Sequence, residues 1–304
     1  MTRTRRSLLQ AAAASGAAAL AGCASGLPGS GSPAASTTEW LYEPGTVADV
    51  DHYLSLRYRP AALAERGANF DDDVYDAMRA FGSSARDLVG FDFEETDAQV
   101  LFGRNSVVET EFEASNVVAV LESDDFTEGD AYGEFDVFVG PDEDAAVGIG
   151  GSTVVVARST GIFGSADDAE AILEAILDVN AGDAESYAED SEDFQTLADT
   201  VVDGDVQSVR THEETTETDT DDGVFAGEVA RGVDSELVED GIETTFVRVF
   251  SEESDVDDGD VQDWVDASDT FGDFESMDVS TDGRVVEVTG TEQTGAYEFY
   301  VSDV

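Results

Sequence analysis

The 304-residue sequence predicts an α+β fold, built mainly from antiparallel sheets with a few amphipathic helices. Apolar residues make up 41% and aromatic residues 9% of the chain, which is enough for a folded core in spite of a net charge of −56. Between residues 98 and 158 the apolar residues alternate or form short runs, a pattern typical of strands. Elsewhere apolar residues recur at steps of three and four, which predicts helices.

Strands are expected at 51–58, between 99 and 158, and between 206 and 301. The first covers 51–58, with Leu54, Leu56 and Tyr58 on one face, and Arg59-Pro60 ends it. Gly150-Gly151 predicts a type I′ hairpin turn, because glycine reaches positive φ angles, and Thr281-Asp282-Gly283 predicts a second hairpin. The other expected strands are 99–103, 107–112, 116–121, 134–139, 145–149, 153–158, 206–211, 224–230, 244–250, 277–280, 284–289 and 296–301.

Four helices are expected. One covers 71–88 with Asp71 as its cap, and a second starts at Ser165 and stops at Asn180-Ala181-Gly182. A third follows Asp190-Ser191, and a short fourth covers 260–267. The acidic, threonine-rich stretch 212–223 is expected to be an exposed loop.

The predicted elements suggest a repeat. A strand at 117–121, a helical stretch and three strands parallel a strand at 246–250, the 260–267 helix and three more strands. This order fits a duplicated β-α-β-β-β unit, with an N-terminal unit at 39–204 and a C-terminal unit at 205–304. Residue identity between the halves is poor, so a chance similarity stays the alternative.

The charge composition excludes several kinds of chemistry. The chain has 70 acidic residues, 14 arginines, no lysine, one cysteine and two histidines. Without lysine there is no P-loop lysine and no Schiff base, and one thiol cannot form an intramolecular disulfide or a cysteine-rich zinc site. The acidic excess disfavours nucleic acid and anionic lipid surfaces as partners of the folded body. It favours a halophilic protein, because salt screens the self-repulsion.

The N-terminus carries the most specific motif. Arg3, Arg5 and Arg6 precede an Ala-rich apolar stretch over 8–20, which is too short to span a bilayer of about 30 Å. Arg5-Arg6 resembles a twin-arginine signal, and Leu20-Ala21-Gly22-Cys23 resembles a lipobox. Together they resemble twin-arginine-exported lipoproteins of halophilic archaeal type.

That resemblance implies a signal peptide at 1–22 and a lipidated Cys23 that becomes the first mature residue. A plain secretory signal cut elsewhere is the alternative. Residues 24–38 are Gly, Ser, Pro, Ala and Thr with one Leu, the composition of a flexible tether, so the segment 23–38 would hold the body beside the membrane. The expected location is the extracellular face of the cell membrane.

A further similarity lies in the body. The segments are Ser152 to Arg158, the 172–180 helix, and Ser186 to Leu197 with its D-F-Q-x-L sequence. This pattern resembles uncharacterised exported proteins of the DUF3352 kind, and Tyr53 to Leu63 resembles the opening strand of their repeats. The resemblance implies an architecture and names no catalytic residue.

The sequence predicts no catalytic residue, cofactor or metal ligand. His212-Glu213-Glu214 stops short of H-E-x-x-H because position 216 is threonine, and His52 has no partner at helical spacing. No G-x-S-x-G nucleophile motif occurs. Two acidic clusters, at 217–222 and 255–260, depart from the EF-hand loop, so weak cation binding is the expectation there.

Arginine is scarce and therefore informative. Six of the 14 arginines lie between Arg57 and Arg104. Internal ion pairing is one interpretation, and an anion or partner site at Arg57 and Arg59 is the other. Arg248, flanked by Phe246 and Phe250, is expected to pair with a nearby carboxylate.

The sequence thus favours a lipid-anchored extracellular protein that binds an envelope protein or small ligand, or serves a structural role in the envelope. An extracellular hydrolase using paired carboxylates is the alternative. A buried carboxylate pair in a cleft walled by aromatics such as Trp264 or Tyr300 would favour the hydrolase. A flat, exposed apolar or arginine-lined patch would favour the binder.

Overall fold

A 12-stranded antiparallel sheet forms the centre of the fold in the computed structural model, which describes residues 37–46, 52–161, 164–165, 168–201, 204–239 and 241–300. Helices cover the sheet, so the α+β prediction is confirmed. The expectations for Arg5, Arg6, Leu20 to Cys23 and the tether up to residue 36 lie outside the described residues. Within those residues, no helix is both long enough and apolar enough to cross a bilayer.

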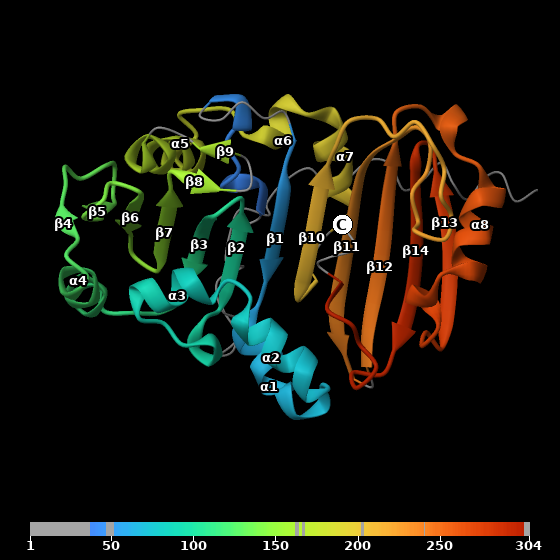
Figure 1. Ribbon diagram of the computed structural model, residues 1–304, viewed down its shortest axis with the longest axis horizontal. Coiled ribbons are helices and arrows are strands. Elements are labelled where there is room, and N and C mark those ends of the chain that lie inside the picture. Colours follow the sequence, from blue (N-terminus) through green and yellow to red (C-terminus); the bar gives the residue numbers. More distant parts are fainter. Residues whose placement is uncertain are drawn as a thin grey trace, which may run out of the picture. The chain divides into compact units, whose positions relative to one another are not determined.

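The chain's first strand lies in the middle of the sheet (Figure 1). Strand β1 pairs with β10 on one side and β2 on the other, so strands from both sides of the predicted division at 204 and 205 share one sheet. The order across the sheet is β13 (Ser276–Asp282), β14 (Val285–Glu292), β12 (Gly241–Phe250), β11 (Glu228–Val238), β10 (Val206–Thr211), β1 (Leu54–Tyr58), β2 (Ala98–Phe102), β3 (Asn105–Glu109), β7 (Thr153–Arg158), β6 (Ala145–Ile149), β5 (Asp136–Val139) and β4 (Thr127–Glu128). A separate pair joins β8 (Thr160–Gly161) to β9 (Gly164–Ser165).

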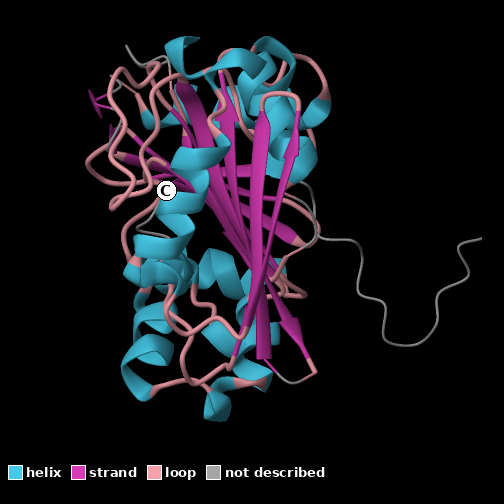
Figure 2. Cartoon of the chain, turned by 90° about the vertical axis from the view of Figure 1, so that its right-hand side faces the viewer, coloured by secondary structure: helices cyan, strands magenta, loops and turns pink. Residues whose placement is uncertain are grey.

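Helices pack on both faces of the sheet (Figure 2). Successive side chains of a strand point to opposite faces of the sheet. Val155 therefore packs in one core with Ile172 and Ile176, and its neighbours Val154 and Val156 pack in another with Leu121. The first face carries α5 (Ala169–Ala181), α6 (Tyr187–Asp190) and α7 (Glu192–Thr200). The second face carries α1 (Pro60–Glu65), α2 (Asp72–Ala80), α3 (Ser83–Val89), α4 (Ala114–Ser123) and α8 (Asp258–Ala267). Short 3₁₀ helices are η2 (Thr37–Glu39), η3 (Pro44–Thr46), η4 (Gly67–Asn69), η5 (Phe93–Glu95), η6 (Glu253–Asp255) and η7 (Asp269–Phe271).

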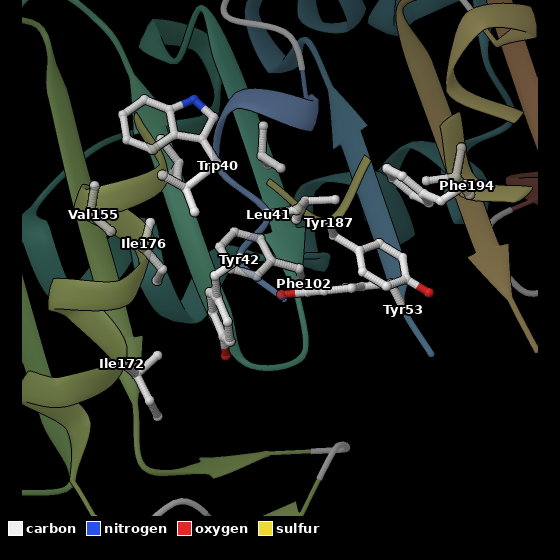
Figure 3. Packing of buried hydrophobic residues seen from close by; sticks show 14 of the residues in the cluster. Trp40, Leu41, Tyr42, Tyr53, Phe102, Val155, Ile172, Ile176, Tyr187 and Phe194 are labelled. Atoms are coloured by element: carbon white, nitrogen blue, oxygen red, sulfur yellow. The ribbon is translucent and has the colours of Figure 1, made fainter. Parts of the chain in front are cut away.

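An aromatic cluster fixes the start of the described chain to the first face (Figure 3). The Tyr53 and Tyr187 rings lie 4.8 Å apart, and those of Tyr187 and Phe194 lie 5.0 Å apart. The Tyr187 N–H donates to the Leu41 carbonyl at 2.8 Å. Offset and tilted aromatic pairs contribute about 0.5–1.5 kcal/mol beyond their buried area. Trp40 and Leu41 are buried, so the described chain enters the core within its first few residues.

Most predicted strands are confirmed, but 116–121 is not a strand. It lies in α4, where Val117 and Leu121 are buried four residues apart. A short apolar run carries no period that separates a strand from a buried helix. The proposed repeat therefore lacks its first strand in the N-terminal half. Of the predicted last strand, residues 296–299 are turn and irregular structure, Tyr300 has 3₁₀-helical conformation, and 301 lies outside the described residues.

The predicted helix over 71–88 is two helices. Asp71 caps α2 as expected, accepting from the Asp73 N–H, but the chain breaks at Phe81-Gly82 before α3. Gly82 has φ of 63°, a left-handed conformation that costs other residues roughly 1–2 kcal/mol. A buried arginine fixes this break, because Arg86 donates to the Arg79 and Phe81 carbonyls.

Two further details differ from the predictions. The helix expected from Ser165 is capped by Asp168, and Ser165 lies in β9. The hairpin at Gly150-Gly151 is present, but neither glycine has a positive φ, so the type I′ expectation is wrong. Gly150 lies close to Phe135 instead: a Cβ there would meet the ring at 2.7 Å.

Candidate functional site

Three of the 14 arginines lie side by side on neighbouring strands. Arg210 of β10 pairs in register with Arg231 of β11, which pairs with Arg248 of β12. Arg248 shares its face of β12 with Phe246 and Phe250. Like charges directly opposite each other destabilise a sheet, so this arginine row requires a counter-charge.

Glu228, the first residue of β11, supplies that counter-charge. Its side chain is fully buried. Oε1 accepts from Arg231 Nε at 2.6 Å and lies 3.2 Å from His212 Nε2, and Oε2 lies 3.7 Å from Arg248 Nε. The expected pairing of Arg248 with a carboxylate is thereby confirmed. We call Glu228, His212, Arg231 and Arg248 the Glu228 cluster.

A β-bulge places the carboxylate on the arginine side of the strand. Residues 228 and 231 are three apart, so a regular strand would send their side chains to opposite faces. The register shifts between Glu228 and Ala230, which adds one residue to β11. Such a bulge re-aims the side chains that follow it, and here it brings Glu228 and Arg231 to one face.

The electrostatics of the cluster favour an ionised carboxylate. Burial alone would raise the pKa of Glu228, but the His212 hydrogen bond and the charges of Arg248 and Arg231 outweigh it and lower that pKa. Both His212 ring nitrogens face oxygens, since Nδ1 lies 2.8 Å from the Glu213 carbonyl.

The cluster also holds both ends of the acidic loop 212–223. His212 binds Glu228 at one end, and Arg248 Nε donates to the Gly223 carbonyl at 3.3 Å at the other. The Arg248 guanidinium lies 4.6 Å from the centre of the Trp264 ring, a cation–π contact. Gly223 has φ of 62° and leaves no room for a Cβ beside Trp264. The prediction that 212–223 is an exposed loop is confirmed. The Glu228 cluster attaches the loop to the sheet at both ends.

The Glu228 cluster is built to hold charge rather than to exchange protons with a substrate. A hydrolase of the expected kind needs two carboxyl groups about 5–9.5 Å apart, one as acid and one as base or nucleophile. The side chains that contact the Glu228 carboxylate are two arginines and a histidine instead. Trp264, named above as a candidate cleft wall, is 3% exposed and packs against Phe225, Phe246 and Phe271.

A second buried carboxyl lies at the end of β14. Glu292 is 1% exposed and accepts a hydrogen bond of 2.9 Å from the Tyr300 hydroxyl. Burial raises the pKa of Glu292 to about 7; the Tyr300 hydrogen bond opposes this, and Asp273 and Glu298 add to it. Tyr297 and Tyr300 are buried in the same core, so the segment after β14 covers this carboxyl.

Arg57 and Arg59, the candidate anion or partner site, tie β1 to the start of β10. The Arg59 guanidinium lies 3.1 Å from Asp205, whose other oxygen accepts from the Leu237 N–H. Arg57 is buried, and its guanidinium donates to the Gly204 carbonyl and the Gln207 side chain, each at 3.4 Å. The Arg59 contact is an internal ion pair, whereas these Arg57 contacts are to neutral oxygens. Binding of an external anion stays a prediction.

The acidic clusters hold local structure where they are described. Asp257 caps α8, and the Asp255 carboxylate accepts from the Ser251 hydroxyl and the Glu252 N–H. Among the residues with described positions, no three His, Cys, Asp or Glu side chains are grouped to hold a metal ion. His52 is half-buried and lies two residues before β1.

A surface cavity of about 180 Å³ lies between α3 and α4. Phe91 and Phe112 line it with their rings 5.3 Å apart, and Glu95, Glu111 and Glu113 also border it. Ligand pockets commonly enclose about 300–1,000 Å³, so this cavity is smaller than a drug-sized ligand requires.

Comparisons with known proteins supply no family. No family model matches the chain, and no curated protein matches it. The chain is similar to crystal form III of TP0453 at 9% identity and a TM-score of 0.46, covering 86% of this chain and 95% of that one. Crystal form I has 11% identity and a TM-score of 0.45, and form IV has 10% identity and a TM-score of 0.42. Each match covers 84% of this chain and 94% of that one. Similarity this distant carries no functional argument, and the resemblance to DUF3352 proteins stays a prediction.

Proposed function

We propose that the protein is a membrane-anchored extracellular lipoprotein that acts by binding or by a structural role in the cell envelope. The observation that carries the proposal is Leu20-Ala21-Gly22-Cys23, which follows Arg5-Arg6 and an apolar stretch. Two-chain lipidation anchors a protein stably, because each buried CH₂ contributes about 0.8 kcal/mol. We propose that the uncharged segment 24–38, made of Gly, Ser, Pro, Ala and Thr with one Leu, serves as a spacer.

The charge of the chain supports a saline exterior. A net charge of −56 repels itself across the body, and salt at about 1 M shortens the Debye length to about 3 Å. We propose that the body is halophilic for this reason. Twin-arginine export of an already folded chain would suit a protein that folds in high salt.

The buried chemistry favours binding over hydrolysis. Two buried acids of the described chain differ in role: Glu228 is held by Arg231 and Arg248, and Glu292 is held by Tyr300 beneath the C-terminal segment. Tyr300 is 3% exposed, so it lies in the core rather than in the wall of an open cleft. Met277 and Val279 lie two residues apart on β13 and are each 41% exposed, so they are apolar side chains that a binding surface could use.

Fractionation of native cells tests the anchor. We expect the wild-type protein in the membrane fraction, released by detergent and not by salt or chelator. The Cys23→Ser variant should lose the lipid, and the Arg5→Lys, Arg6→Lys double variant should stay inside the cell. A Cys23→Ser protein that fractionates with membranes as the wild type does would refute the lipid anchor.

A further inference from the structure

The two edges of the sheet differ in how they are protected. At one end lies β4, with only two residues, and at the other lies β13, with seven (Figure 1). Every residue of β13 is exposed, and its register with β14 runs from Ser276 to Asp282 without a bulge. Short edges, bulges, Pro and charged side chains are the usual protections against pairing, and of these β13 has only the charges of Asp278 and Asp282.

The exposed apolar side chains of the fold lie on this edge. Within the described chain, the exposed large hydrophobic side chains are Met277 and Val279, each 41% exposed. Val279 pairs with Val288, which is buried in the core beneath α8. The apolar face of the sheet therefore continues to an open edge.

The sequence of β13 is self-complementary. Antiparallel pairing with a second copy, centred on Val279, would set Met277 opposite Thr281 and Asp278 opposite Ser280. No carboxylate would face a carboxylate directly. A two-fold axis perpendicular to the sheet keeps the same face up in both copies, so the Val288 and Val279 row would continue into the partner.

We propose that β13 is the interface for a second copy of this chain, paired antiparallel about Val279 and controlled by salt. The two Asp278 carboxylates would lie diagonally across the pair, roughly 7–8 Å apart. The Debye length is about 10 Å at 0.1 M and about 3 Å at 1 M, so their repulsion acts in dilute buffer and is screened in brine. The aspartates protect the edge at low salt only. Pairing through one strand is smaller than a standard interface of about 1,200–2,000 Å², so the dimer should be weak and reversible.

Disulfide trapping tests the register directly, because the chain has a single cysteine. In the full chain carrying Cys23→Ser, Val279→Cys would place two thiols opposite each other, with Cα atoms about 4.5–5.5 Å apart. That spacing suits a disulfide. The matched control is Asp282→Cys on the same strand, whose thiols would lie about six residues apart along the pair, too far to bridge.

In 1 M salt under mild oxidation, we expect Val279→Cys to form a covalent dimer at least ten times faster than Asp282→Cys. Circular dichroism in the same buffer verifies that both variants are folded. Equal rates, no dimer, or faster trapping of Asp282→Cys would overturn the proposal.

Sedimentation of the parent chain without a thiol is a second test, and it should show self-association in 1 M salt. We expect Val279→Lys to abolish this self-association. Ala119→Lys, an equal charge change at an exposed position of α4, should leave it intact. Self-association that survives Val279→Lys would use another surface and would also overturn it.

Discussion

Glu292 is a buried carboxyl whose charge state should affect stability near neutral pH. Its pKa is raised from 4.5 to about 7, so the folded chain binds this proton more tightly than the unfolded chain. The contribution to stability is complete below about 4.5 and is lost as the pH rises through about 7. Each pKa unit corresponds to about 1.4 kcal/mol, so the full effect is on the order of 3 kcal/mol.

Glu292→Gln mimics the protonated acid and should remove this pH dependence. We expect the variant to match the wild type at pH 4.5 and to be more stable at pH 8, by up to on the order of 3 kcal/mol. Urea unfolding at the two pH values, at one fixed salt concentration, measures the difference. A variant that is equally destabilised at both values would show that Glu292 acts through packing instead.

Glu228 has the opposite behaviour, because its pKa is lowered. The contribution of Glu228 to the free energy of unfolding is present above the ordinary carboxyl pKa and is lost as the pH falls through the lowered pKa. Glu228→Gln leaves Arg231 and Arg248 facing each other without a counter-charge, so we expect a loss of about 3–5 kcal/mol. Glu236→Gln, exposed on the same strand, is the control and should change stability by less than about 0.5 kcal/mol.

At the scale of elements, the Glu228 cluster should hold the loop 212–223 in place. In Glu228→Gln, hydrogen exchange or proteolysis should increase in this loop before the rest of the sheet opens. Residues of β1 and β2 provide the internal reference. If exchange rises equally in loop and sheet, then the cluster stabilises the whole fold without a special role at the loop.

The break between α2 and α3 also depends on one residue. Gly82 has φ of 63°, and a Cβ there would lie 2.7 Å from the Tyr58 hydroxyl and 2.9 Å from Leu101. We expect Gly82→Ala to lower the free energy of unfolding by about 2–4 kcal/mol, through strain and overpacking together. Gly283→Ala isolates the strain, since Gly283 has φ of 60° and open space around it, and should cost about 1–2 kcal/mol. Equal effects in thermal or urea unfolding would exclude the packing contribution.

Local sequence patterns predicted most helices and strands. They failed where one pattern fits two kinds of element. Alternation located β2, β5, β6, β7 and β12, and Asp71, Ser191 and Gly182 marked helix ends. Residues 116–121 were misread because an apolar run of Val, Ala and Leu fits either a strand or a helix. In 71–88, a continuous apolar stripe masked the break that Gly82 makes.

The candidate site was only partly predictable. Two phenylalanines beside Arg248 indicated that the arginine needed a carboxylate, but nothing local identified Glu228 as its partner. The arginine row depends on the register of three strands and on a bulge, which sequence patterns do not reveal. The central place of β1, between strands far away in the sequence, was hidden for the same reason.

At the scale of the whole molecule, salt should govern stability. A chain with 70 acidic and 14 basic residues gains stability as screening shortens the range of repulsion. We expect the unfolding midpoint to rise steadily from 0.1 M to above 1 M sodium chloride at fixed pH. A midpoint that is independent of salt would contradict the halophilic proposal while leaving the lipid anchor untouched.

The central claim is that Cys23 carries the lipid that keeps this acidic body at the membrane. Intact mass analysis of the protein extracted from its native membrane tests it most directly. We predict a chain that starts at Cys23 and is heavier than the 282-residue polypeptide by the mass of a thioether-linked lipid. A chain that keeps residues 1–22, or one with an unmodified Cys23, would contradict the account.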